Sequence, residues 1–412
     1  MADRHVEHLL VGGGVASASC ARWLRESGGA GSILLVGREP DPPYDRPPCS
    51  KGYLQGTETR EDTYVRPAGW WEEQSVELMT RSSVLKLDPQ ERVATLSTQE
   101  QVSFTTALIA TGANVRLLRV PGAQLDGIHY LRALRNADTI REDVAGRERV
   151  VLIGGSYIGT EVAASLTLLG KRCTIVMQED VTLERGFGQT AGGYFQQILE
   201  EHGVEVIGGE SLHHFDGTDD RVSAVVTESG REIPADVVVI GAGAVPDTML
   251  AKAAGLELGE TGGVRCSARL QTSVPGIYAA GDVCEYDSPI HGGQIRVEHW
   301  DVALSQGRTA ALNMLGGDVA HDTIPYFFSD LADWSSMEYV GPAYHWDREV
   351  VRGSMDDGAF SVWYLQGDRV AAALSVGRGE DLEHARRLIA GRVELGERVE
   401  MLGDVGADLA GL

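Results

Sequence analysis

The sequence contains one short pattern twice, and this repeat limits the possible folds more than any other feature. An apolar strand, a glycine turn and a helix occupy residues 8–26, and the pattern returns at residues 150–169, so that Gly154 follows Gly12 by 142 positions. A second strand follows each helix. Parallel strands joined in this way are typical of dinucleotide-binding domains. The repeat therefore predicts an α/β fold with two Rossmann-like, doubly wound dinucleotide-binding domains.

Three further apolar runs end in glycine or aspartate, as buried strands of such domains do. They are Ala107–Gly112, Asp236–Gly243 and Gly276–Asp282. The last run lies well beyond the second repeat, which indicates that the second domain is inserted into the first. We therefore expect the first domain to comprise residues 1–117 and 242–321, and the second domain to comprise residues 118–241.

The pattern changes after about residue 322, where short strands alternate with turns and one amphipathic helix follows at residues 382–389. This arrangement predicts a small α+β domain over residues 322–412. The tail from about Gly403 is rich in glycine and aspartate, and we expect it to be frayed.

Composition excludes several classes of protein. The formal net charge of −24 disfavours nucleic acid and anionic lipid as general partners. No apolar run reaches the roughly 18 residues of a membrane span, and the N-terminus does not resemble a signal peptide. The cysteines form no C-x-x-C pair, so we expect neither a disulfide framework nor a metal site, and we expect a reducing, cytoplasmic setting. These cysteines are Cys20, Cys49, Cys173, Cys266 and Cys284.

The first glycine turn has the residue types that a pyrophosphate needs. Gly12 permits the tight bend, Gly14 permits close approach of the backbone, and the following helix directs its N-terminus at the phosphate charge. Ser17 stands where a third glycine is common and only a small residue is required. After the second strand, Glu39 is the candidate for binding ribose hydroxyls, although it could equally be a solvated loop charge.

The second glycine turn departs from this pattern at Ser156, whose Cβ crowds the approach to a pyrophosphate and could weaken nucleotide affinity. Met177 ends the next strand, where an NAD-binding protein usually has an acid. No arginine or lysine for a 2′-phosphate occurs in Met177–Asp180. The sequence therefore favours NADH over NADPH.

Residues Pro43–Lys51 read PYDRPPCSK, and they resemble the PYDRPPLSK segment of FAD-dependent ferredoxin reductases. These enzymes supply electrons to Rieske oxygenases and cytochromes P450, and apoptosis-inducing factor is related to them. The resemblance covers the chain to about residue 390 and implies a fold of the glutathione reductase type. It also includes Ala110–Gly112, Gly281–Asp282, Glu298–Trp300 and Phe327–Asp330.

The resemblance implies FAD in the first domain and NADH, or less favourably NADPH, in the second. Hydride would pass from NADH to flavin N5, and single electrons would pass to a ferredoxin-type iron–sulfur protein. The implied FAD-binding residues are Gly12, Gly14, Val15, Ala16, Ser17, Glu39, Arg46, Lys51, Ala110, Thr111, Gly112, Gly281, Asp282, Glu298, His299, Trp300 and Phe328. The implied NAD-binding residues are Gly154, Gly155, Ser156, Tyr157, Ile158, Gly159, Glu161, Met177, Gly241, Ala242 and Gly243.

Two of these residues are the catalytic candidates. The resemblance places Lys51 beside the flavin ring and Glu161 near the nicotinamide carboxamide. A reduced flavin carries negative charge near its pyrimidine ring, so a nearby ammonium favours reduction, and Lys51 could pair with Glu161. The alternative is that Lys51 is a surface lysine at a helix start. Asp282 could likewise cap a helix, either instead of binding FAD or in addition to it.

Several features leave the acceptor and the reaction open. Phe328 stands where relatives commonly have tryptophan, although plain core packing is the alternative. An acidic ferredoxin would be repelled by the net charge unless arginines form a local patch, for which Arg46, Arg66, Arg296 and Arg308 are candidates. Cys49 offers a second function, a single-cysteine NADH-dependent disulfide or peroxide reductase. A third is an NADH-gated interaction protein resembling apoptosis-inducing factor, and the chain could be a monomer or a homodimer.

Overall fold

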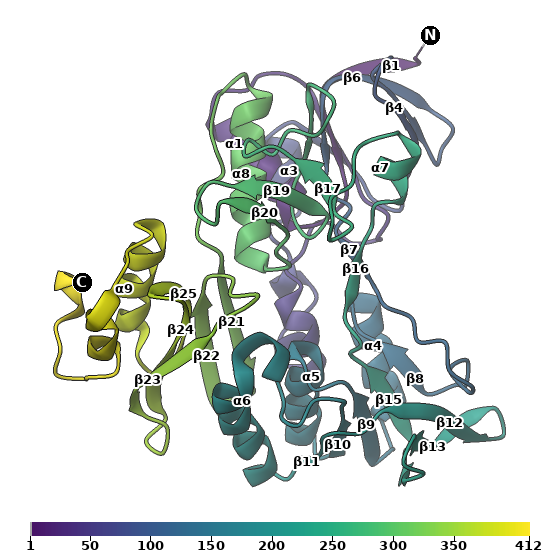
Figure 1. The fold of residues 1–412 in the computed structure, drawn as a ribbon. Coiled ribbons are helices and arrows are strands. Elements are labelled where there is room, and N and C mark those ends of the chain that lie inside the picture. The colour runs from purple at the N-terminus through teal and green to yellow at the C-terminus, as the bar shows by residue number, and fades with distance from the viewer. Residues whose placement is uncertain (1) are drawn as a thin grey trace. The chain divides into compact units, whose positions relative to one another are not determined.

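The computed structural model describes residues 2–412, and the chain divides into two compact units (Figure 1). Unit 1 contains the chain up to Asp45, Glu61–Asn114 and Val245–Pro325. Unit 2 contains Arg46–Arg60, Val115–Ala244 and Tyr326–Leu412. This division differs from the expected domains because Arg46–Arg60 and the C-terminal part both group with the middle of the chain.

Unit 1 is built on a seven-stranded sheet with the strand order β3-β2-β1-β6-β5-β4, in which β18 also pairs with β6. The pairs β1–β2, β1–β6, β2–β3 and β18–β6 are parallel, as the first repeat predicts, whereas β4 and β5 form an antiparallel edge. The strands are β1 (Arg4–Val11), β2 (Ile33–Val36), β3 (Val76–Met79), β4 (Val84–Asp88), β5 (Val93–Leu96), β6 (Gln101–Ile109) and β18 (Ile277–Ala279).

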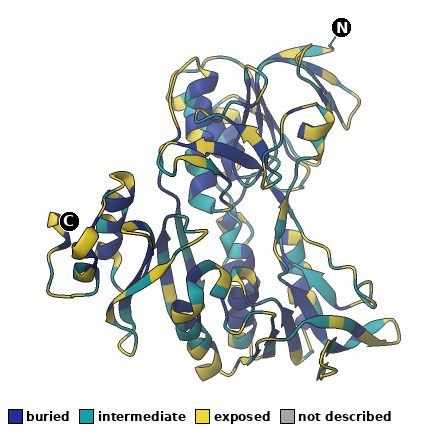
Figure 2. Cartoon of the chain, viewed as in Figure 1, coloured by how far each residue is buried: buried dark blue, intermediate teal, exposed yellow. Residues whose placement is uncertain are grey.

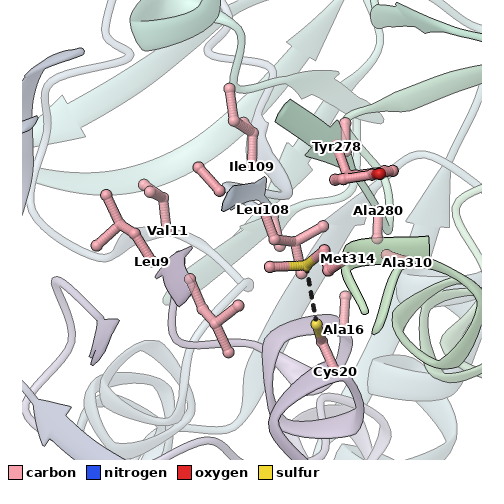
Figure 3. Packing of buried hydrophobic residues seen from close by; sticks show 14 of the residues in the cluster. Leu9, Val11, Ala16, Cys20, Leu108, Ile109, Tyr278, Ala280, Ala310 and Met314 are labelled. Atoms are coloured by element: carbon pink, nitrogen blue, oxygen red, sulfur yellow. Dashed lines mark hydrogen bonds between the residues drawn. The ribbon is translucent and has the colours of Figure 1, made fainter. Parts of the chain in front are cut away.

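Helices α1 (Val15–Glu26) and α8 (Trp300–Met314) pack together over the core of this sheet. Gly307 permits their close approach, because a Cβ there would lie 2.3 Å from the carbonyl oxygen of Ala16. Figure 3 shows Cys20 of α1 beside Met314 of α8, with 3.7 Å between their sulfur atoms. The remaining elements are α3 (Trp70–Glu73), α7 (Met249–Ala253), η2 (Glu61–Thr63), and the sheet β17 (Val264–Cys266), β19 (Cys284–Ser288) and β20 (Gly293–Ile295).

His321, in the buried part of unit 1, gives a prediction for the dependence of stability on pH. Its ring lies 5.0 Å from that of Tyr286, its Nδ1 is 3.1 Å from Thr309 Oγ1, and burial lowers its pKa to about 4. The unfolded chain therefore binds a proton that the folded chain excludes between pH 6.5 and about pH 4. We expect acidification across this range to lower the free energy of unfolding by up to about 3 kcal/mol through this residue.

Urea denaturation at several pH values tests this expectation. The stability lost between pH 6.5 and pH 4.5 should be smaller in His321→Phe than in the unaltered protein. It should be unchanged in His213→Asn, which alters an exposed histidine. Equal losses in all three proteins would contradict the role of His321.

Unit 2 contains a five-stranded parallel sheet with the strand order β11-β10-β9-β15-β8, as the second repeat predicts. Helix α2 and the helical turn η1 contact α4 and α5, which explains why Arg46–Arg60 groups with this unit. The strands are β8 (Ile128–Tyr130), β9 (Arg149–Ile153), β10 (Arg172–Val176), β11 (Glu205–Ile207) and β15 (Val237–Ile240). The helical elements are η1 (Pro47–Ser50), α2 (Gly52–Gln55), α4 (Leu134–Val144), α5 (Tyr157–Leu168) and α6 (Glu184–Glu201).

Two antiparallel sheets complete unit 2, and a short two-stranded sheet pairs β7 (Ala113–Val115) with β16 (Ala244–Pro246). The smaller sheet of unit 2 contains β12 (Leu212–Thr218), β13 (Arg221–Thr227) and β14 (Glu232–Pro234). The larger has the order β21-β22-β25-β24-β23 and carries α9 (Gly379–Ala390), as the predicted α+β region requires. Its strands are β21 (Tyr326–Leu331), β22 (Ser335–Val340), β23 (Arg348–Ser354), β24 (Ala359–Gln366) and β25 (Arg369–Val376).

The prediction of a frayed tail is wrong. Short helical turns form at η3 (Gly396–Leu402) and η4 (Leu409–Gly411), and Leu402, Leu409 and Leu412 are buried. Figure 2 colours the chain by burial. The guanidinium of Arg387 donates to the carbonyl oxygens of Leu409 and Leu412 at 2.6 and 2.7 Å. Leucines and arginine donors therefore order a segment whose glycines and aspartates favour disorder.

Among residues 2–412, no helix combines the length and the apolar character needed to cross a membrane. All five cysteines are free and buried. The described part of the chain contains no cluster of three or more histidine, cysteine or acidic side chains suited to a metal ion.

Candidate functional site

The first glycine turn forms an open cradle at the N-terminus of α1. Gly12 has φ +119°, and a Cβ there would lie 2.1 Å from the carbonyl oxygen of Ala110, so only glycine fits. Gly14 precedes the helix with φ −97°, and no atom lies within 4 Å of where its Cβ would be. No side chain caps the helix, so its first N–H groups and its positive dipole end are available to an anion. Val15, Ala16 and Ser17 form the buried first turn.

Two buried polar atoms of unit 1 fit a ligand at this cradle. Within the described chain, Ser17 Oγ and Gln306 Nε2 have no hydrogen-bond partner. Gln306 Oε1 accepts the N–H of Gly281 at 2.7 Å, and a Cβ on Gly281 would lie 3.4 Å from Ala16 Cβ. The Gly281–Asp282 turn, predicted from sequence, is thus adjacent to α1. Orphaned polar atoms beside an open helix N-terminus fit the pyrophosphate and ribityl groups of FAD.

The segment Ala110–Gly112 follows β6, and Thr111 Oγ1 donates to the carbonyl oxygen of Asp247 at 2.7 Å. Glu39, predicted to bind ribose, accepts a hydrogen bond of 2.5 Å from the hydroxyl of Tyr44. Sequence reasoning missed Arg38, which lies 2.9 Å from Asp247 Oδ2 and 2.8 Å from Asn114 Oδ1. Its position two residues after the end of β2 is the signal that could have identified it.

The predicted segment Glu298–Trp300 is tied to the rest of unit 1 by two polar contacts. Trp300 Nε1 donates to Asp45 Oδ1 at 2.6 Å, and burial raises the pKa of Asp45 despite this hydrogen bond. Arg296 donates to Glu298 Oε1 at 2.5 Å and to the carbonyl oxygen of Asp282 at 3.0 Å. His299 directly precedes α8.

Two of the four candidate arginines for a basic patch are engaged by other groups of the protein. The side chain of Arg296 is only 14% exposed and is paired with Glu298, so it adds little net positive charge to the surface. Arg46 belongs to unit 2, where it donates to the carbonyl oxygen of Arg132 at 2.7 Å. Arg66 and Arg308 lie over the rings of Trp70 and Trp23 in unit 1.

The second glycine turn repeats this geometry in unit 2. Gly154 has φ +105°, and a Cβ there would lie 2.6 Å from the carbonyl oxygen of Gly241. A Cβ on Gly159 would lie 2.0 Å from the carbonyl oxygen of Gly154. Both positions therefore require glycine. Ser156 precedes α5, is exposed and does not cap the helix. Tyr157 and Ile158 open α5, and Ala242 and Gly243 follow Gly241 at the end of β15.

The end of β10 forms a pocket of about 420 Å³ in which acidic side chains predominate. Met177 is buried. A Cβ added at Gly155 would lie 2.1 Å from the sulfur of Met177, so the two residues are closely packed. Arg185, which sequence reasoning missed, lines the pocket and forms an ion pair with Glu179. Arg185 lies in the first turn of α6. Its distance from the end of β10 therefore depends on the loop that joins β10 to α6. The lining residues are Gln178, Glu179, Asp180, Glu184 and Arg185.

Lys51 and Glu161, the two catalytic candidates, meet in unit 2. Lys51 Nζ lies 3.4 Å from Glu161 Oε1, and it donates to Asp330 Oδ2 at 2.9 Å. The ammonium also lies 4.6 Å from the ring centre of Phe328. Sequence reasoning did not assign Asp330 a role, although it ends the matching segment Phe327–Asp330. The alternative interpretation, that Lys51 is a surface lysine at a helix start, is wrong because its side chain is only 15% exposed.

The side chain of Cys49 is buried, and the side chain of Phe327 packs against other aromatic rings. The thiol-bearing residue Cys49 is 3% exposed in η1. The ring of Phe327 lies 4.5 Å from that of Tyr157 and 6.5 Å from that of Phe187, so it belongs to an aromatic core. Phe328 points instead to the Lys51 ammonium.

Family models cover most of the chain. The model described as pyridine nucleotide-disulphide oxidoreductase matches residues 6–307, and the model described as reductase C-terminal matches residues 326–412. The chain is 34% identical to rhodocoxin reductase of Rhodococcus erythropolis, covering 97% of this chain and 93% of that protein. It is 33% identical to putidaredoxin reductase of Pseudomonas putida, and the match covers 97% of this chain and 95% of that protein. Apoptosis-inducing factor 3 of Homo sapiens is 28% identical, and the match covers 89% of this chain and 60% of that protein.

Solved structures give the same picture. The ferredoxin reductase for the CYP199A2 system from Rhodopseudomonas palustris matches with a TM-score of 0.93 and 30% identity, covering 98% of this chain and 99% of that one. The reductase in the covalent putidaredoxin reductase–putidaredoxin complex matches with a TM-score of 0.92 and 33% identity, covering 100% and 98%. These matches confirm the predicted fold class and the predicted resemblance.

Proposed function

This chain belongs to the pyridine nucleotide-disulphide oxidoreductase family, and from that premise we propose that it carries electrons from NADH, through FAD, to a ferredoxin-type iron–sulfur protein. The observation that carries the proposal is the pair of glycine turns, each with a positive φ and each opening a helix without a side-chain cap. Two dinucleotides in one chain are what a nicotinamide-dependent flavoenzyme requires.

We propose that unit 1 holds FAD. The first N–H groups of α1, approached past Gly14, would bind the pyrophosphate, with Ser17 Oγ and Gln306 Nε2 as further donors. Glu39 and Arg38 would bind the adenosine end, and the turn at Asp282 would bind the ribityl end. Bound FAD would supply a ring that accepts hydride at N5 and releases electrons one at a time. Arg296 and Asp45 would hold the segment Glu298–Trp300 in position.

We propose that the turn Gly154–Gly159 of unit 2 binds the pyrophosphate of NADH at the N-terminus of α5. Ser156 is exposed, so we propose that the serine narrows the approach of the pyrophosphate to the backbone without closing it. Glu161 lies one turn into α5 and would accept a hydrogen bond from the nicotinamide carboxamide. Lys51 would place its positive charge beside the flavin and favour the reduced, anionic form.

The acceptor follows from the relatives. Rhodocoxin reductase and putidaredoxin reductase are named for their iron–sulfur partners, and both match nearly the whole chain, including its C-terminal part. We propose the same partner class here, in the service of a cytochrome P450 or a Rieske oxygenase. We propose functional domains at residues 1–117 with 242–321, 118–241 and 322–412. A cytoplasmic location is supported by the five free cysteines.

Three measurements test this function in sequence. The purified protein should retain FAD, as seen in its visible absorbance, and anaerobic NADH should bleach it rapidly. Addition of a two-iron, two-sulfur ferredoxin should then accelerate cytochrome c reduction. A protein that binds no flavin would overturn the whole proposal, and turnover that no iron–sulfur protein accelerates would overturn the acceptor.

The pocket at the end of β10 predicts a preference for NADH. Glu179, Asp180 and Glu184 line it, and the single guanidinium, that of Arg185, is already paired with Glu179. A 2′-phosphate would meet this negative field, so we expect kcat/KM to be at least about tenfold lower with NADPH than with NADH. Glu179→Gln frees Arg185 and should reduce this ratio, whereas the exposed Glu201→Gln should not. An unchanged ratio in Glu179→Gln would contradict the role of the pocket.

Replacement of Cys49 separates the proposed function from a disulfide or peroxide reductase. Cys49 is 3% exposed and packs within η1, so we expect Cys49→Ser to keep NADH oxidation and ferredoxin-linked cytochrome c reduction within about twofold of the unaltered rates. Stopped-flow bleaching by NADH checks the first step separately. Loss of turnover in Cys49→Ser would instead support the single-cysteine enzyme. An NADH-dependent change of elution volume in size-exclusion chromatography would favour the NADH-gated interaction protein.

A further inference from the structure

Lys51 is shared by two carboxylates that come from different parts of unit 2. It lies between η1 and α2, whereas Glu161 lies in α5 and Asp330 in β21. The ammonium donates to Asp330 at 2.9 Å and lies 3.4 Å from Glu161. The direct hydrogen bond therefore goes to Asp330, although the sequence suggested Glu161 as the partner.

Glu161 is held by other donors. Ser50 Oγ donates to its Oε2 at 2.6 Å, and Ser329 Oγ donates to its Oε1 at 2.5 Å. Ser50 is fixed in turn, because its carbonyl oxygen accepts the hydroxyl of Ser165 at 2.7 Å. Both oxygens of this buried carboxylate are thus satisfied without Lys51. The ammonium remains available to a second acceptor.

Asp330 is suited to be that acceptor. Its Oδ1 accepts the hydroxyl of Ser336, the residue opposite it on β22, at 2.6 Å, so the carboxylate is oriented by the sheet. Its side chain is 33% exposed, against 7% for Glu161. Water screens the attraction of Asp330 to the ammonium more than that of Glu161, but Asp330 accepts a direct hydrogen bond from Lys51 at 2.9 Å, whereas Glu161 lies 3.4 Å away.

We propose that Asp330 is the principal counter-ion and positioning residue of Lys51, and that it limits how strongly Lys51 stabilises negative charge on the reduced flavin. The inference rests on the proposed function for the placement of Lys51 beside the flavin. Two carboxylates face one ammonium, so the group formed by Lys51, Glu161 and Asp330 carries one net negative charge. Removal of the Asp330 charge leaves Lys51 with Glu161 alone and makes the group neutral.

The test compares Asp330→Asn with Asp333→Asn in the flavin-loaded protein. Both variants remove one negative charge from the region of β21 and β22, but Asp333 is exposed and, in the described part of the chain, forms no ion pair with Lys51. The first readout is the chemical reactivity of the Lys51 amine, which peptide mass spectrometry can resolve because the chain has only four lysines. We expect labelling of Lys51, relative to Lys86, to rise severalfold in Asp330→Asn and to stay constant in Asp333→Asn.

The second readout is the two-electron midpoint potential of the flavin. We expect a positive shift in Asp330→Asn that corresponds to about a tenfold change in the equilibrium, which is roughly 30 mV for a two-electron couple. The shift should be smaller when Asp330→Asn is combined with Lys51→Gln, because the effect acts through Lys51.

Unchanged Lys51 labelling in Asp330→Asn would overturn the inference and leave the proposed function intact. An equal potential shift in the presence and in the absence of Lys51 would also overturn it, since Asp330 would then act directly. Failure of the proposed function is recognised separately, because the unaltered protein would bind no flavin.

Discussion

Gly14→Ala is expected to lower the affinity for FAD at least about 100-fold, equivalent to about 2.7 kcal/mol, while the apoprotein keeps its stability. A methyl group at Gly14 meets no protein atom within 4 Å, and φ −97° is open to alanine. The folded protein therefore has no reason to resist the change. The methyl group instead occupies the space through which the backbone would approach the pyrophosphate.

Gly12→Ala separates this effect from backbone strain. At Gly12 the added methyl group would lie 2.1 Å from the carbonyl oxygen of Ala110, in a backbone with φ +119°. This variant should lose folding stability as well as flavin, whereas Gly14→Ala should lose flavin alone. Gly28→Ala is a control for alanine at a positive φ, because no atom lies within 4 Å of the added group and it is remote from the cradle.

Flavin retention after desalting and urea denaturation of the apoprotein measure the two quantities independently. A Gly14→Ala protein that retains FAD as well as the unaltered protein would show that the pyrophosphate does not bind at this turn. A Gly14→Ala apoprotein that is much less stable would show that the position is structural.

The local parts of the site could be predicted from the sequence. A positive φ, a tight bend and an open helix N-terminus depend on a few adjacent residues, so Gly12 and Gly154 could be identified before their surroundings were known. The helices begin at Val15 and Tyr157, directly after Gly14 and Ser156. Boundaries of this kind depend on hydrogen bonds that a residue pattern does not specify.

The partners of Lys51 could not be predicted in the same way. Asp330 reaches the ammonium only because β21 packs beside α5, a contact between segments far apart in the chain. Serine is common at protein surfaces, but Ser50 and Ser329 are buried, and their bonds to Glu161 become visible only when three segments meet. The sequence indicated that Lys51 and Glu161 could pair, but the order of preference among acceptors is a property of the packing.

The C-terminal tail shows how composition can mislead. Its glycines and aspartates resemble a disordered segment, and the stabilising partners come from β23 and α9 instead of from the tail itself. The buried guanidinium of Arg352 donates to the carbonyl oxygens of Met401, Asp404, Val405 and Ala407. An arginine that binds four carbonyl groups fixes a segment whose own regular structure is limited to short helical turns.

Asp381→Ala is expected to lower the free energy of unfolding by about 3–5 kcal/mol. Asp381 is 2% exposed, lies 3.3 Å from Arg352 Nε and accepts a 2.8 Å hydrogen bond from Arg378. Its loss leaves the Arg352 guanidinium, 6% exposed, without a counter-charge in the protein interior. The hydroxyl of Ser361 also loses its acceptor.

Urea denaturation of the full chain measures the loss, and Glu383→Ala provides the matched control because Glu383 is an exposed acid on the same helix. Since Arg352 also holds the tail, limited proteolysis should cut Asp381→Ala between Met401 and Leu412 faster than the control. Comparable stability and comparable cleavage in the two variants would mean that Arg352 does not need Asp381 to stay buried. The ion pair between Asp381 and Arg352 would then be a consequence of the packing instead of a cause.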